Sequence, residues 1–76
     1  GMMEWKPIET APKRVNVIAW RKDAAGPFLA AFGTAHDLTG WEDADDETES
    51  WWADGQDLAP HYPTHWMPLP PPPEPT

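Results

Sequence analysis

A chain of 76 residues without a single cysteine has to be stabilised by packing, because neither a disulfide nor a thiolate zinc site can hold it together. Small size is a second restriction, since a domain of about 60 residues buries only about 60% of the surface that its unfolded chain exposes. Large aromatic side chains compensate, and the chain has six tryptophans: Trp5, Trp20, Trp41, Trp51, Trp52 and Trp66. We therefore expect one small domain over residues 4–70, with a homo-oligomer as a further source of buried surface.

Two apolar segments in the first half predict a β-hairpin. Residues 14–21 place Val15, Val17 and Ala19 on one face and Ile18 and Trp20 on the other. Residues 28–34 place Phe28, Ala30 and Phe32 on one face, and the turn residues of 22–27 join the two segments. Because both strands carry apolar residues on both faces, we expect a sheet covered on both sides, by tryptophan-bearing segments or by another subunit.

The remaining segments predict short strands, and no regular helix is expected. Residues 50–53 form a strand that ends at the Asp54-Gly55 turn, residues 56–63 are a loop, and residues 64–67 form a last strand. Pro7 and Pro12 discourage a regular helix at the start but allow a single turn between them. The fold class predicted is mainly β: a small antiparallel sheet of about four short strands, with tryptophan- and proline-rich covering segments and little helix.

Charge is distributed unevenly along the sequence. Residues 1–22 hold all five cations and two acids, whereas residues 23–76 hold eleven acids and no Lys or Arg. Six acids lie between residues 42 and 49, so residues 42–50 are expected to form an acidic, mobile loop, with a short helix as the alternative. Such a surface repels phosphate backbones, which argues against nucleic-acid binding. A basic protein partner or a protein that imitates the charge of DNA fits it better.

Two segments together resemble a known family. The first runs from Trp5 to Lys13, a valine-bearing strand follows, and the second runs from Thr64 to Pro70. In this order they are similar to domain-of-unknown-function family 551, small proteins carried by phages, prophages and proteobacterial genomes. The residues that match the family pattern or its expected core are Trp5, Pro7, Pro12, Trp20, Thr64, His65, Trp66, Met67, Pro68, Leu69 and Pro70.

The resemblance implies a phage or prophage accessory protein. Because no activity is assigned to the family, it supplies no catalytic residue. This sequence departs from the family pattern after Lys13, where Arg14-Val15-Asn16 stands in place of an Asp-Gly turn. The acidic stretch 42–49 is an insertion relative to shorter members, so any property that depends on it is peculiar to this chain.

The residues offer little chemistry for catalysis. There is no cysteine, no Gly-x-Ser-x-Gly and no glycine-rich phosphate loop, and most carboxylates lie in the acidic stretch, so we expect no enzyme and no cofactor. His61 and His65 are four residues apart, the spacing at which a helix can hold zinc, but Pro63 argues against that helix. They are weak candidates for a metal site, with His36 or an acid as a third ligand.

The proline-rich end divides into two parts. Thr64 to Pro70 is expected to belong to the fold, and residues 71–76 to form a disordered or polyproline tail. Pro68 to Pro71 also fits the PxxP pattern that SH3, WW and EVH1 domains bind, although no arginine flanks it.

The sequence thus favours a non-enzymatic phage or prophage accessory protein that binds an unidentified protein partner. One alternative is a small-ligand or metal-binding protein that uses His61, His65 and nearby aromatic rings; another is an acidic, DNA-mimicking inhibitor of a host enzyme. With no signal peptide and no apolar run of 18 residues, a cytoplasmic protein without a membrane partner is expected.

Overall fold

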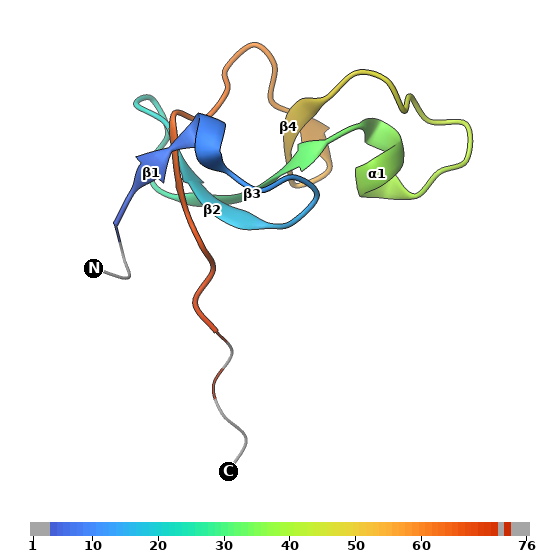
Figure 1. The fold of residues 1–76 in the computed structure, drawn as a ribbon. Coiled ribbons are helices and arrows are strands. Elements are labelled where there is room, and N and C mark those ends of the chain that lie inside the picture. The colour runs from blue at the N-terminus through green and yellow to red at the C-terminus, as the bar shows by residue number, and fades with distance from the viewer. Residues whose placement is uncertain (1–3, 72, 74–76) are drawn as a thin grey trace.

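The computed structural model describes residues 4–71 and 73 and consists mainly of β-structure (Figure 1). One antiparallel sheet contains six strands in the order β1-β6-β2-β3-β4-β5. The strands are β1 (Lys6–Pro7), β2 (Val17–Trp20), β3 (Phe28–Gly33), β4 (Ser50–Ala53), β5 (Gln56–Asp57) and β6 (His65–Met67). The expected mainly β, antiparallel class is confirmed, and the strand count exceeds the expected four because the two-residue strands β1 and β5 join the edges.

The central hairpin of β2 and β3 has the alternation that the sequence predicts. Val17 lies opposite Ala30 and Ala19 lies opposite Phe28. The strand begins at Val17 rather than at Arg14, because Arg14 adopts a left-handed backbone with a φ of 65°. The Arg14 N–H donates to the Phe32 carbonyl at 2.7 Å, so the chain turns sharply here without the glycine that such a conformation favours.

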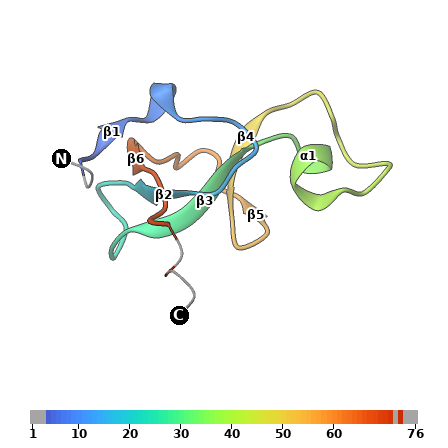
Figure 2. The same cartoon turned by 60° about the horizontal axis from the view of Figure 1, so that its bottom comes forward.

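The two family-like segments pair with each other in the sheet. β6 lies between β1 and β2, with Lys6 opposite Trp66 and Ala19 opposite Trp66 on its other side. A 3-10 turn, η1 (Ile8–Thr10), follows β1, where a single turn was expected between the two prolines. Figure 2 shows β6 inserted between strands made much earlier in the chain.

A short helix, α1 (Ala35–Thr39), precedes the acidic stretch. The Thr34 hydroxyl accepts from the Asp37 N–H at 3.0 Å, the Asp37 carboxylate accepts from the Thr34 N–H at 3.3 Å, and Gly40 ends the helix with a φ of 75°. Residues 41–49 contain neither helix nor strand. The acids therefore follow α1 rather than form it, and the helical alternative for that stretch is wrong.

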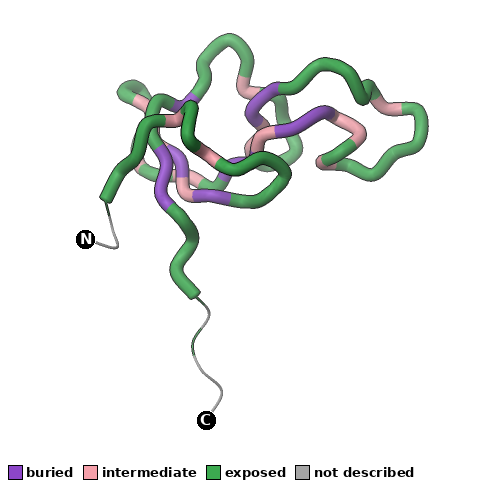
Figure 3. Tube along the Cα trace, viewed as in Figure 1, coloured by how far each residue is buried: buried purple, intermediate pink, exposed green. Residues whose placement is uncertain are grey.

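The core cluster lies on one face of the sheet, and Figure 3 marks the buried stretches along the chain. Its buried residues are Val17, Ala19, Ala30, Trp51 and Trp66, and the partly buried residues packed against them are Ile8, Ala11, Phe28, Phe32, Ala53 and Leu58. Two of the six indoles are buried, fewer than a core built on tryptophan implies. On the opposite face Ala31 and Met67 are buried but lie outside this cluster, so the expected covering of that face is incomplete among the described residues.

Candidate functional site

The face of the sheet opposite the core is apolar and only partly covered, since Ala31 and Met67 on it are buried but Leu29 is exposed. Successive side chains of a strand point to opposite faces, so Ile18 and Trp20 lie on the face opposite to Val17 and Ala19. Strand register extends this surface across the sheet. We call it the open face, and its residues are Ile18, Trp20, Leu29, Ala31, Trp52, His65 and Met67.

The open face exposes a large apolar side chain. Leu29 on β3 is 52% exposed, Ile18 opposite it on β2 is half-buried, and Trp52 on β4 is half-buried as well. Helix α1 lies beside the end of β3 rather than across the sheet, as Figures 1 and 2 show together. Its Asp37 and Leu38 contact the sheet where Gly33 leaves room for them. The helix therefore closes one end of the open face and leaves the centre accessible.

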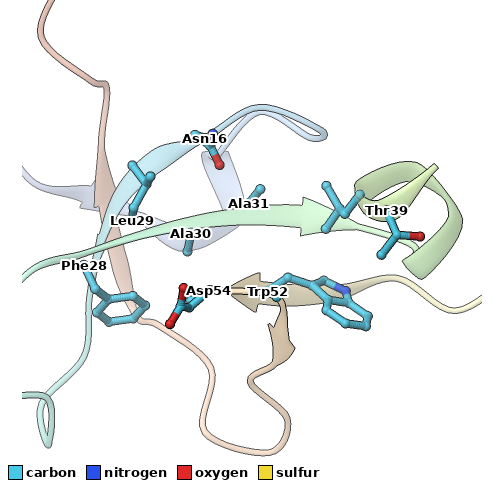
Figure 4. A pocket seen from close by; sticks show the side chains of 11 residues that line it. Asn16, Phe28, Leu29, Ala30, Ala31, Thr39, Trp52 and Asp54 are labelled. Carbon is cyan, nitrogen blue, oxygen red and sulfur yellow. The ribbon is translucent and has the colours of Figure 1, made fainter. Parts of the chain in front are cut away.

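A groove of about 460 Å³ crosses this face next to the β4–β5 turn (Figure 4). Its apolar lining includes Leu29, Ala31, Leu38 and Trp52, and polar residues at its margin include Asn16, Thr39 and Asp54. The indole Nε1 of Trp52 is shielded from solvent and has no hydrogen-bond acceptor among the described residues. The fold leaves a donor unused there, which is rare for a buried polar atom.

Three aromatic rings form a second hollow, which we call the aromatic notch. It has a volume of about 380 Å³ and is lined by Trp5, Trp20 and His65, which come from the segments around β1, β2 and β6. The Trp20 and His65 rings meet edge to face with their centroids 5.8 Å apart. Thr64 holds this arrangement, because its N–H donates to the Trp20 carbonyl at 2.9 Å and its hydroxyl lies 2.9 Å from Nδ1 of His65.

The two candidate metal ligands are used differently. His65 contributes to the aromatic notch, whereas the His61 carbonyl accepts from Nη1 of Arg21 at 2.6 Å. The segment from His61 to His65 is not helical and contains the buried Pro63, so the spacing that a zinc-binding helix requires is not realised. Across residues 4–71 and 73, no three His, Cys, Asp or Glu side chains are grouped so that they could hold a metal ion.

The other family-like residues divide between core and surface. Trp66 and Met67 are buried in β6, and Nε1 of Trp66 donates to the Thr10 hydroxyl at 2.9 Å. Pro68, Leu69 and Pro70 are exposed beyond the strand, and Pro7 and Pro12 are exposed at the start of the chain. Of the predicted tail, residues 72 and 74–76 lie outside the described residues.

Negative charge is concentrated in the loop that follows helix α1. Lys13, Arg14 and Arg21 form ion pairs with Glu49, Asp37 and Asp23 at 3.1, 3.2 and 3.1 Å. Most acids of the 41–49 loop have no such partner among the described residues, and this loop follows directly from α1, which lines the groove through Leu38 and Thr39. Asp54 adds a carboxylate to the lining of the groove.

Local hydrogen bonds keep three of the acids ionised. The Thr34 N–H lowers the pKa of Asp37, with a smaller contribution from Arg14. The N–H groups of Glu47 and Thr48 lower the pKa of Asp45, and the Ser50 hydroxyl and Ala59 N–H lower that of Asp57. These carboxylates therefore stay negative at neutral pH.

Sequence reasoning expected both faces of the strands that carry Ile18 and Leu29 to be covered, and it did not identify these residues or Trp52 as a site. Leu38 was not singled out either, because α1 was not expected. The signal was present in the apolar residues on both faces of the strands, which indicates a second contact surface whenever the chain is too short to cover it.

Within the described residues, no helix is long and apolar enough to cross a membrane. No protein-family model, curated protein or solved structure matches this chain, so the similarity to domain-of-unknown-function family 551 stays a prediction from its terminal segments.

Proposed function

We propose that this protein is a non-enzymatic interaction module that binds a protein partner through the open face. The observation that carries the proposal is the 52% exposure of Leu29 on β3, opposite the half-buried Ile18 and on the same face as the half-buried Trp52. An apolar surface of this kind, bordered by polar residues, is typical of a contact site on a small soluble domain. A partner would remove from water the apolar area that the chain does not cover.

The form of the site supports a protein partner. The groove offers an apolar lining of aliphatic and aromatic side chains with polar groups at its margin, which resembles the composition of protein interfaces. Energetically important contacts at such interfaces are usually a few large side chains inserted into pockets. We therefore expect a large apolar side chain of the partner to contact Leu29, Leu38 and Trp52.

The distribution of acids favours a partner with a basic surface. Asp54 lines the groove and the acidic 41–49 loop follows α1 in the chain, and such charges act mainly on the rate of encounter and on the choice of partner. A phage or prophage setting and a cytoplasmic location are part of the proposal, and they rest on the resemblance and composition of the sequence.

Capture from a bacterial lysate followed by mass spectrometry tests the role of the open face. The wild-type chain is compared with Leu29→Glu and with Val15→Glu as a matched control, because Val15 is similarly exposed (48%) but does not line the groove. We expect the same specific protein with wild type and Val15→Glu, and its loss with Leu29→Glu. Circular dichroism and thermal melting confirm that all three are folded.

Equal capture by Leu29→Glu would contradict binding through the open face. A variant with neutral residues 42–49 separates the roles of charge and apolar contact. If that variant alone loses the partner, the DNA-mimic alternative gains support and the open-face proposal loses it.

A further inference from the structure

We propose that the groove binds an extended, basic segment of the partner, which pairs as an added strand with residues 28–30 of β3. The edge of residues 28–30 that faces the β4 side is called the free edge. This contact rests on the proposed function, because it describes how a partner that contacts Leu29 is held. Pairing uses the main chain of β3, whereas the proposed function depends on side chains, so each can fail without the other.

The two halves of β3 pair with different neighbours. Residues 28–30 lie opposite β2, whereas residues 31–33 lie opposite β4. β4 ends at Ala53, where the chain turns back into β5, so the described part of β4 has no residue in register with residues 28–30. Figure 4 shows β4 turning away before it reaches the start of β3. The first half of β3 therefore has a neighbour on one side and the groove on the other.

The main-chain groups of Leu29 point to the free edge. In an antiparallel sheet, the N–H and C=O of one residue point to the same side of the strand, and successive residues alternate. The Trp20 carbonyl accepts from the Thr64 N–H on the β6 side of β2, so Ala19, the residue before it, points towards β3. Its partner Phe28 points back towards β2. Leu29, the next residue, points away from β2.

A second hydrogen bond gives the same direction. The segment that leads into β2 donates the Arg14 N–H to the Phe32 carbonyl at 2.7 Å, so Phe32 points to the β2 side. Leu29 is three residues earlier and points to the other side. Neither the β3–β4 ladder nor a turn contact among the described residues reaches the Leu29 N–H and C=O, and Leu29 is 52% exposed. An accessible donor and acceptor on a strand edge can pair with a strand of another chain.

The side chains at the groove fit an extended segment. Leu29 and Trp52 lie on the same face of the sheet and both line the groove, so alternate side chains of an added strand would contact them. Pro27 precedes β3 and has no N–H, which limits pairing beyond residue 28. The added strand is therefore short, and its affinity needs side-chain contacts as well as main-chain hydrogen bonds.

Asp54 determines the charge expected of the segment. It lines the groove and forms no ion pair with any described residue. A second copy that paired through the same edge would bring Asp54 against Asp54, and each copy carries a net charge of −8, so like charges disfavour it. A Lys or Arg of the partner can place its charge beside Asp54 and its aliphatic part along the apolar lining. The contact is therefore assigned to a basic partner rather than to a second copy.

Fluorescence anisotropy with a labelled octapeptide of alternating valine and lysine tests this contact on the full chain. We expect saturable binding. A peptide with proline in place of valine keeps the charge but cannot pair as a strand, and it should bind about tenfold more weakly or worse, because main-chain hydrogen bonds are lost. A peptide with glutamate in place of lysine should not bind, because its charge has the sign of Asp54.

Charge variants of the protein locate the binding site of the valine–lysine peptide. Asp54→Asn should weaken its binding several-fold, and asparagine tolerates the left-handed backbone at this position, where φ is 53°. Asp43→Asn is the matched control, because it removes the same charge from the acidic loop, outside the groove. We expect it to leave binding near that of wild type.

Hydrogen exchange of single amides, measured by NMR, reports the main-chain contact itself. The saturating valine–lysine peptide should slow exchange of the Leu29 amide about tenfold or more, because pairing replaces water at that N–H, and should leave the Asp43 amide unchanged. Three results would each overturn strand addition: no saturable binding of this peptide, equal binding of the proline peptide, or unchanged exchange of Leu29 in the bound protein.

The two proposals are distinguishable by their failures. If Leu29→Glu abolishes partner capture but the Leu29 amide is not protected by the peptide, the open face remains the contact site and strand addition is wrong. If the peptide protects the Leu29 amide but Leu29→Glu captures the partner as wild type does, the proposed function is wrong and the free edge binds strands without it.

Discussion

At the scale of single residues, the six indoles have different structural roles. Trp66 is 8% exposed and belongs to the core, whereas Trp41 is 70% exposed after α1. Trp66→Ala is expected to lower the free energy of unfolding by about 3–5 kcal/mol, because it leaves a cavity and removes the partner of the Thr10 hydroxyl. Urea denaturation of wild type, Trp66→Ala and the control Trp41→Ala measures this loss of stability. Trp41→Ala should stay within about 0.5 kcal/mol of wild type, and a loss below about 1 kcal/mol for Trp66→Ala would be incompatible with its place in the core.

Asp37 gives the fold a dependence on acid. Its folded-state pKa lies below the usual 3.8, chiefly because it accepts from the Thr34 N–H. The stability that this depression provides is present above the unfolded-state pKa and is lost as the pH falls through the lower folded-state value. Thermal melting from neutral pH to about pH 2 should therefore show a smaller decrease in Tm for Asp37→Asn than for wild type.

The control for that experiment is Asp43→Asn. Asp43 is exposed in the acidic loop and makes no hydrogen bond to the rest of the described chain. Its substitution should leave the acid dependence near that of wild type. If Tm depends on pH in the same way for wild type and for Asp37→Asn, the capping box does not lower the pKa of Asp37.

At the scale of elements, the sequence was most informative where local pattern and tertiary structure agree. The alternation of residues 17–20 and 28–33, and the Asp54-Gly55 turn, predicted the β2–β3 hairpin and the end of β4. β1 and β5 have two residues each and lack any local strand pattern, so only pairing with β6 and β4 defines them. Helix α1 has five residues, and its capping box could have been found at Thr34-x-x-Asp37.

The candidate site was less predictable than the fold. His65 was identified with neighbouring aromatic rings, and the structure places it against Trp20. The third ring of the aromatic notch, Trp5, is sixty residues away from His65 in sequence. Only the insertion of β6 beside β1 brings Trp5 and His65 together. The groove depends on where α1 ends beside β3, and residue periodicity carries no information about that.

The turn between β4 and β5 provides a test at this scale. Asp54 and Gly55 have φ values of 53° and 77° and form a two-residue loop, as in a type I′ hairpin turn. Gly55→Ala should lower the free energy of unfolding by about 1 kcal/mol, because a side chain is unfavourable in this left-handed conformation. Gly26→Ala is the control, since an added Cβ there meets no atom within 4 Å and the backbone is not left-handed. Equal effects of the two in urea denaturation would contradict the turn assignment.

At the scale of the whole molecule, a net charge of −8 on 76 residues makes self-repulsion a general term in the stability. Salt screens repulsion between exposed charges, so Tm should rise between about 10 mM and 500 mM sodium chloride. A variant with amides at the six acids of residues 42–49 should melt higher at low salt and respond less to salt. If the two chains respond equally, the acidic loop is not the main source of repulsion.

The position of β6 has a consequence for how the protein is made. β1 and β2 are made before β3, β4 and β5, but β6, which separates them in the sheet, is the last of the six described strands to be made. Until residues 65–67 emerge, β1 has no neighbour and Val17 and Ala19 lack the indole of Trp66. Such distant pairing delays folding, because a long loop must close before any contact compensates for its entropy. The nascent chain therefore completes its sheet only after residues 65–67 have emerged, and a chain terminated before Trp66 would lack both the partner of β1 and part of the core.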